Sequence, residues 1–203
     1  MSMITKIDIL IIGGGMYVSG KGTTSEGTIL PALLEGLRQG LVGRLGLVTT
    51  SADSANENKE LFHSLTQRMG LEGQCECFPK SGNNELAYLE AVEQFKPDAV
   101  VVSVPDHLHA SVSIALIKKG LHCLVVKPMA PTLEEADAMT EAAKKDGVIA
   151  QVEFHKRLDE SNLLLRDVVQ SGKLGTLLYA VIEYSQKKQI PRSVFRSWAE
   201  KSS

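Results

Sequence analysis

Three glycines near the start of the chain could hold a phosphate group. Gly13-Gly14-Gly15 directly follows an apolar run, where glycine lets the backbone approach a pyrophosphate and helix N–H groups face its charge. We therefore predict cofactor contacts from Gly13, Gly15 and Met16. The third position of the Gly-x-Gly-x-x-Gly fingerprint is Val18, so an ordinary surface loop stays open, and the glycine-rich stretch that follows delays the predicted helix to about Thr28.

The same stretch nearly spells the phosphate-binding motif of P-loop enzymes, Gly-x4-Gly-Lys-Ser/Thr. Lys21 stands in the position of the motif's lysine, but Gly22 stands where a magnesium-binding hydroxyl is required. A P-loop-like nucleotide phosphotransferase is therefore one alternative function. A non-catalytic dinucleotide-binding module is another.

The segment Thr49-Thr50-Ser51 ends the second apolar run, where an acidic residue would bind the ribose of NAD. The segment holds no acid, Asp53 comes late, and Lys59 could reach the site only from an inward-facing helix position. We predict that Thr50 and Ser51 contact NAD or NADP, with a mild preference for NADP.

A later apolar run ends in polar residues that would lie at the same edge of a parallel sheet. The segment reads Val104-Pro105-Asp106-His107-Leu108-His109. Open α/β sheets bind ligands at the carboxyl ends of their strands, although histidines in a first helical turn are often structural. The predicted cofactor contacts here are Val104, Pro105, His107 and His109.

Lys127-Pro128 follows the buried-looking run Leu124-Val125-Val126. Desolvation disfavours a charged ammonium, so partial burial would help Lys127 exchange a proton with a substrate oxygen. We predict that Lys127 is catalytic and contacts both cofactor and substrate, and that Pro128 contacts the cofactor. The alternative is a solvated loop lysine.

Alternation of short apolar runs with helical periodicity predicts an α/β fold in which a doubly wound, Rossmann-type parallel sheet occupies residues 1–150. The predicted strands cover residues 7–12, 45–49, 99–104, 122–126 and 148–154, with a weaker one at 75–78. Predicted helix signals are the stripe of Leu30, Leu33, Leu34 and Leu37, capping boxes at 54–57 and 132–135, and a helix over 85–95 capped by Asn83 or Asn84.

The pattern changes after Phe154. A helix is predicted over 161–171, followed by one long strand from Thr176 to Ser185 whose partner strands are missing. Residues 151–203 are therefore expected to begin a substrate or oligomerisation domain of the α+β class that is incomplete.

Composition narrows the possible partners. The net charge is -2 and the charges are mixed along the chain, so we expect no nucleic-acid partner and no membrane partner. The first apolar stretch is too short for a signal peptide or a membrane span, which predicts a cytoplasmic protein. Cys75, Cys77 and Cys123 are interpreted as reduced thiols, and no metal site is predicted.

Several motifs, in order, resemble the Gfo/Idh/MocA oxidoreductases, which act on sugars, inositols and related polyols with NAD(P). The matching segments are residues 99–109, 115–128, 132–136, 151–157 and 172–175, together with Trp198. The resemblance implies an NAD(P)-dependent dehydrogenase or reductase with a sugar-like substrate, and a parent protein that forms a homo-oligomer.

The resemblance also assigns residues. It implies that Lys127 lies near nicotinamide and substrate, that Pro128 follows a cis peptide, and that Trp198 contacts the cofactor. It places His155 and Arg157 in the segment that crosses to the substrate domain, so we predict that both contact substrate.

The chain departs from the family at two motifs and lacks a third. Val126 replaces the family's glutamate before Lys-Pro, and Ala199 replaces the arginine after Trp198. The family's Asp-x-x-x-His segment does not occur. We therefore expect these 203 residues to bind cofactor with little or no turnover.

Overall fold

A computed structural model describes residues 5–183 and 185. The chain divides into two compact units, Met1–Val152 and Glu153–Ser203, and each is described by itself.

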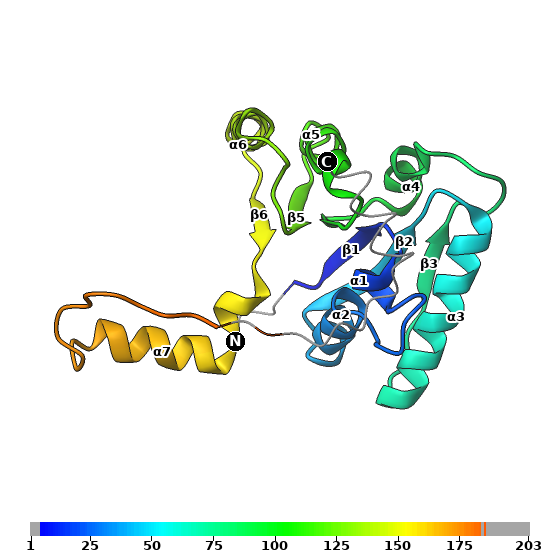
Figure 1. The fold of residues 1–203 in the computed structure, drawn as a ribbon. Coiled ribbons are helices and arrows are strands. Elements are labelled where there is room, and N and C mark those ends of the chain that lie inside the picture. The colour runs from blue at the N-terminus through cyan, green and yellow to red at the C-terminus, as the bar shows by residue number, and fades with distance from the viewer. Residues whose placement is uncertain (1–4, 184, 186–203) are drawn as a thin grey trace. The chain divides into compact units, whose positions relative to one another are not determined.

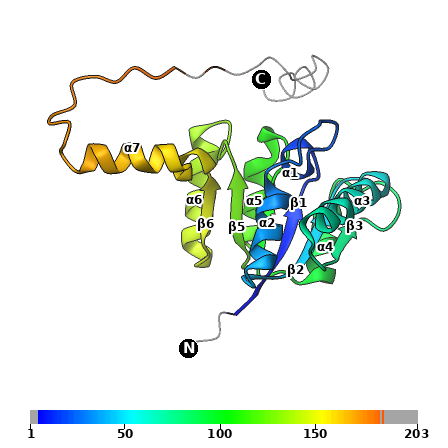
Figure 2. The same cartoon turned by 90° about the horizontal axis from the view of Figure 1, so that it is seen from below.

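The first unit is built on a six-stranded sheet with the order β3-β2-β1-β4-β5-β6 (Figures 1 and 2). β1 pairs in parallel with both β2 and β4, β2 pairs in parallel with β3, and β4 pairs in parallel with β5. This is the order of dinucleotide-binding folds. The strands are β1 (Ile7–Ile12), β2 (Val42–Val48), β3 (Cys75–Phe78), β4 (Ala99–Val102), β5 (His122–Val126) and β6 (Ala150–Glu153).

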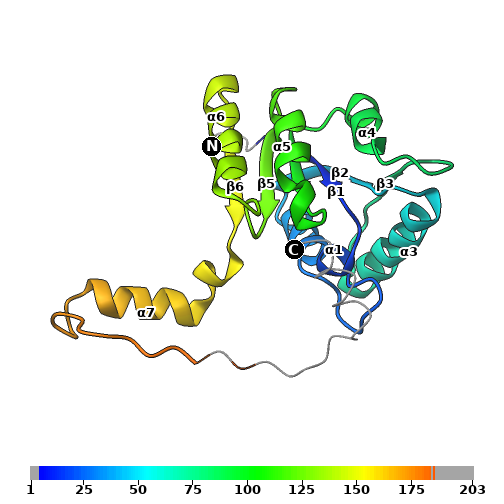
Figure 3. The ribbon, with the colours of Figure 1, turned by 45° about the horizontal axis from the view of Figure 1, so that its top comes forward.

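Helices cover both faces of the sheet, so the predicted doubly wound α/β fold is confirmed. One apolar cluster joins the sheet to α1 (Met16–Ser19), α2 (Ile29–Arg38) and α3 (Ala52–Met69). The other joins it to α4 (Ala87–Phe95), α5 (His109–Ile117) and α6 (Leu133–Asp146). Figure 3 shows α3 beside β3, against which it packs at the edge of the sheet.

Successive residues of the central strands point into opposite clusters. Leu10 and Val100 belong to the α4–α6 cluster, whereas Ile11 and Val101 belong to the α1–α3 cluster, and all four are at most 3% exposed. A strand buried on both faces has to be apolar at every position. That requirement explains why these runs were easy to recognise in the sequence.

The three cysteines are free and buried in the first unit. Burial raises the pKa of the Cys123 thiol to about 12, so this side chain stays a neutral, apolar part of the core. The interpretation of the cysteines as reduced thiols agrees with this arrangement.

The predicted strands and helices need several corrections. β1, β3 and β5 have the predicted bounds, but β2 begins earlier, at Val42, and β4 ends at Val102. The predicted cap at Ser54 is wrong because Ser51 caps α3, its hydroxyl accepting a hydrogen bond from the Ser54 N–H. Thr132 caps α6 as predicted, while α4 begins at Ala87, two residues later than expected.

The second unit contains a 3-10 turn at His155–Leu158 and the helix α7 (Glu160–Gln170). The long strand predicted from Thr176 to Ser185 is wrong, because residues 176–183 have no regular secondary structure. Alternating apolar side chains favour a strand only where a neighbour pairs with its backbone, and none of the described residues supplies one.

The carboxyl ends of β1 and β4 come into very close backbone contact. Gly13 has φ +107°, and a Cβ built on it would overlap the carbonyl oxygen of Ser103. The Gly13 N–H donates to the carbonyl of Val48 and the Ser103 N–H donates to that of Ile12, both at 2.8 Å. Only glycine fits at position 13.

Replacing Gly13 by alanine should therefore lower the free energy of unfolding by at least about 2 kcal/mol, since a left-handed backbone strains an L-residue and the new methyl group meets a carbonyl. Gly15→Ala is the matched control. Gly15 has φ -82° and open space where a Cβ would lie, so its change should stay below about 1 kcal/mol. Urea unfolding without ligand measures both, and equal effects would contradict the prediction.

Candidate functional site

The glycine turn after β1 is held from behind by α3. The amide Nδ2 of Asn58 donates to the Gly14 carbonyl at 3.1 Å and to the Ser54 carbonyl at 2.9 Å. Asn58 is fully buried, so the turn is fixed before any ligand arrives. An asparagine in a helix gives no sequence signal for this role, because its partner lies 44 residues away.

The outer side of the turn is open. Gly15 and Met16 are exposed, and Gly15 caps the short helix α1. The first helix therefore begins at Met16 and not, as predicted from the sequence, at about Thr28. The first turn of a helix leaves backbone N–H groups without intrahelical partners. Val18, at the incomplete fingerprint position, is fully buried and packs into the α1–α3 cluster.

The glycine-rich loop of residues 20–27 closes on itself. A Cβ on Gly20 would overlap the Ser25 carbonyl oxygen, and one on Gly27 would press on the carbonyl of Val18. The loop is also tied to α3, because Lys21 Nζ lies 2.6 Å from Glu57 Oε2. This arrangement disfavours the P-loop alternative, since Lys21 is held against α3.

The residues after β2 surround the start of α3. Thr50 is exposed and its carbonyl accepts from the Asn84 N–H at 2.9 Å, whereas the Ser51 hydroxyl serves as the helix cap. Asp53 is exposed in the first turn of α3. Lys59 lines a groove of about 450 Å³ beside α3 and β3.

His109 joins the ends of β4 and β5. Its Nε2 lies 2.9 Å from the carbonyl oxygen of Val104, and its Nδ1 lies 2.6 Å from that of Pro128. The side chain is fully buried, which favours a positioning role over the predicted contact with cofactor. His107, in contrast, is exposed in the 3-10 turn Asp106–Leu108 beside Pro105.

Lys127 directly follows β5, and its peptide bond to Pro128 is cis. The partial burial expected for Lys127 is wrong: among the described residues, its side chain is exposed. Its Nζ lies 6.0 Å from the centre of the Tyr17 ring, at the outer limit of a cation–π interaction. Tyr17 was not predicted, although it follows Met16 in α1.

Most of the predicted site residues therefore come together at one edge of the first unit, where the four strands β1, β2, β4 and β5 end. They are Gly13, Gly15, Met16, Thr50, Ser51, Val104, Pro105, His107, Lys127 and Pro128, with His109 buried beneath them. Trp198 lies outside the described residues.

Two predicted substrate residues belong to the second unit. His155 Nδ1 lies 2.9 Å from Glu153 Oε1, and the Arg157 guanidinium lies 4.8 Å from the centre of the Phe154 ring. Arg157 is exposed and His155 is partly exposed. Their contact with substrate stays a prediction.

Comparison with known protein families identifies this arrangement. Residues 44–154, more than half of the chain, match the model of the Gfo/Idh/MocA oxidoreductase family with its NAD-binding Rossmann fold. The chain belongs to the Gfo/Idh/MocA family. The resemblance predicted from the ordered motifs is thereby confirmed.

Relatives and solved structures agree with this assignment. The chain is 28% identical over 124 residues to levoglucosan dehydrogenase of Pseudarthrobacter phenanthrenivorans, covering 61% of this chain and 29% of that protein. It is 29% identical over 104 residues to the NADP(+)-dependent scyllo-inositol 2-dehydrogenase IolW of Bacillus subtilis, covering 51% and 28%.

The fold is also similar to that of the WlbA dehydrogenase of Bordetella pertussis, solved with NADH and UDP-GlcNAcA. The TM-score is 0.62 at 19% identity, covering 84% of this chain and 44% of that one. The matched residues span less than a third of the length of levoglucosan dehydrogenase and of IolW. In residues 5–183 and 185, no helix is long and apolar enough to cross a membrane and no cluster of metal ligands occurs.

The buried contacts of His109 generate a test of its positioning role. His109→Leu would take the ring nitrogens away from the part-buried carbonyls of Val104 and Pro128, which should lower the free energy of unfolding by about 1 to 3 kcal/mol. The same substitution at exposed His107 should change it by less than about 0.5 kcal/mol. Thermal or urea unfolding of the two variants measures both effects, and a His109→Leu variant as stable as the native chain would contradict the positioning role of His109.

Proposed function

We propose that the first unit binds NAD(P) across the carboxyl edge of its sheet. We also propose that the protein passes hydride between nicotinamide and a carbon of a sugar, a cyclitol or a derivative. The observation that carries this proposal is the approach of Lys127 to Tyr17. This approach places Lys127, the residue best suited to proton transfer, near α1, which follows the glycine turn suited to a pyrophosphate.

The exposed side of the site fits a dinucleotide. Gly15 has open space in front of its α-carbon, so a pyrophosphate can approach the backbone of Gly13, Gly15 and Met16. Thr50 and Ser51 would hold the adenosine ribose. Further contacts would come from Val104, Pro105, His107 and Pro128.

The bound nicotinamide would supply or accept the hydride. In the reducing direction, the ammonium of Lys127 donates a proton to the carbonyl oxygen as the carbonyl carbon gains the hydride, so that C=O becomes CH–OH. In the oxidising direction, the neutral amine takes the proton from the hydroxyl group. His109 positions this step through the carbonyl of Pro128, while His155 and Arg157 contact the substrate.

The substrate class rests on the relatives, which include a levoglucosan dehydrogenase and a scyllo-inositol 2-dehydrogenase. For the cofactor we favour NADP, because Thr49-Thr50-Ser51 offers no carboxylate to the ribose of NAD. The free, buried cysteines support a cytoplasmic location. The family assignment supports a homo-oligomeric protein.

Cofactor binding can be tested on this chain by its thermal stability. NAD or NADP at about 100 times its dissociation constant should add about 2.7 kcal/mol to the free energy of unfolding. ATP with magnesium is the comparison that represents a phosphotransferase. Stabilisation by ATP with magnesium, but by neither NAD nor NADP, would contradict the proposed function.

The role of Lys127 is tested by measuring turnover of the full-length protein, with levoglucosan and inositols as trial substrates. Lys127→Met should lower kcat by about 100-fold or more, because a positioned proton donor contributes about 10²–10⁴-fold, and should leave cofactor binding nearly unchanged. Lys145→Met, at an exposed lysine on α6, is the control. Unchanged turnover in Lys127→Met would exclude Lys127 from the chemistry, whereas absence of turnover in the native protein would favour a non-catalytic binding module.

A further inference from the structure

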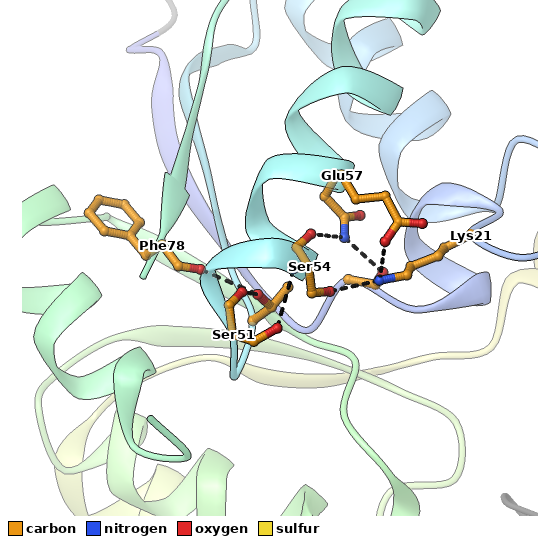
Figure 4. A network of polar contacts seen from close by, with 8 residues as sticks. Lys21, Ser51, Ser54, Glu57 and Phe78 are labelled. Atoms are coloured by element: carbon orange, nitrogen blue, oxygen red, sulfur yellow. Dashed lines mark hydrogen bonds and ion pairs between the residues drawn. The ribbon is translucent and has the colours of Figure 1, made fainter. Parts of the chain in front are cut away.

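The segment Thr49-Thr50-Ser51 after β2 lacks an acid, but a lysine from another loop contacts Ser54, in the first turn of α3. Lys21 belongs to the loop of residues 20–27, and its Nζ donates to the Ser54 hydroxyl at 2.9 Å. The Ser54 N–H in turn donates to the Ser51 hydroxyl at 3.2 Å. Figure 4 shows these side chains as one polar network at the start of α3.

The lysine is held in place by the rest of its loop. Gly20 and Gly27 allow the loop to close, and the Thr28 N–H donates to the Tyr17 carbonyl at 2.7 Å. An ion pair of 2.6 Å between Arg68 and Glu26 ties the same loop to α3 a second time. Only 30% of the Lys21 side chain is exposed, so its ammonium is restricted to this region.

Glu57 makes the balance of charge depend on Lys21. Its carboxylate lies 2.6 Å from Lys21 Nζ and is about half exposed, which places a negative charge close to Ser54. A phosphate group is repelled by this carboxylate unless the ammonium stands between them. A ribose hydroxyl, which is neutral and can donate a hydrogen bond, is not repelled.

We propose that Lys21 selects the cofactor by binding the 2′-phosphate of NADP, together with the Ser54 hydroxyl. This inference rests on the proposed function, because it assumes that the adenosine ribose lies beside Thr50 and Ser51. Lys21 supplies the base that the β2 segment lacks, and it does so from the glycine-rich loop. Without Lys21, Glu57 would act as the acid that favours NAD.

The test measures dissociation constants for NADPH and NADH by nicotinamide fluorescence. The native chain should bind NADPH at least about tenfold more tightly than NADH. Lys21→Met should weaken NADPH binding at least about tenfold and leave NADH binding unchanged or tighter. Glu57→Gln should tighten NADPH binding, because it removes the repulsion and keeps the lysine.

Lys59→Met is the matched control, since Lys59 is an exposed lysine of α3 that lines the groove beside β3. It should leave the ratio of the two constants unchanged.

Equal loss of NADPH and NADH binding in Lys21→Met, or no loss of either, would overturn the role of Lys21. Equal binding of both nucleotides by the native chain would overturn it too, whereas binding of neither would overturn the proposed function itself. A melting curve of each variant shows that it is folded, and Glu57→Gln supplies an independent readout should Lys21→Met fail to fold.

Discussion

The backbone contact between Gly13 and Ser103 is the constraint on which the candidate site depends. It lies between β1 and β4, the pair of strands at which the connections of a doubly wound sheet turn in opposite directions. Because helices leave this point on both sides, the edge stays open to a ligand. A residue with a side chain at position 13 would push the two strands apart. The open turn at Gly15 and the ends of the neighbouring strands would then lose their common edge.

The sequence predicted the parts of the fold that depend on local pattern. Strands such as Ile7–Ile12 and His122–Val126 are recognisable because burial on both faces demands continuous apolar residues. Helix caps were harder to predict. Ser51 and Ser54 both suit an N-cap, and hydrogen bonds of Thr50 and Ala52 to the segment of residues 82–84 fix the start of α3 at Ala52. The strand predicted from Thr176 failed for a related reason, since alternation of side chains carries no information about whether a pairing strand exists.

The candidate site was predicted in its main residues but not in its supports. Lys127 and the glycine turn were evident because each follows a buried run directly. Asn58, Tyr17 and Lys21 act through contacts with residues distant in sequence, and no local pattern announces those contacts. Even the incomplete fingerprint at Val18 has a tertiary explanation. Glycine in that position serves close packing of helix and strand, and here Val18 fills that space as part of the core.

Val126 decides the surroundings of Lys127. Its side chain is 6% exposed and packs into the α1–α3 cluster, so the position that carries the family's glutamate here contributes an apolar group to the core. Residue 126 therefore offers no carboxylate to Lys127, whose described neighbour is the Tyr17 ring. Lys127 itself is exposed, so a substrate oxygen can approach its ammonium from solvent. The position of that ammonium is therefore set by the backbone at the end of β5, where the peptide bond to Pro128 is cis, and by the Tyr17 ring, and not by an ion pair with residue 126.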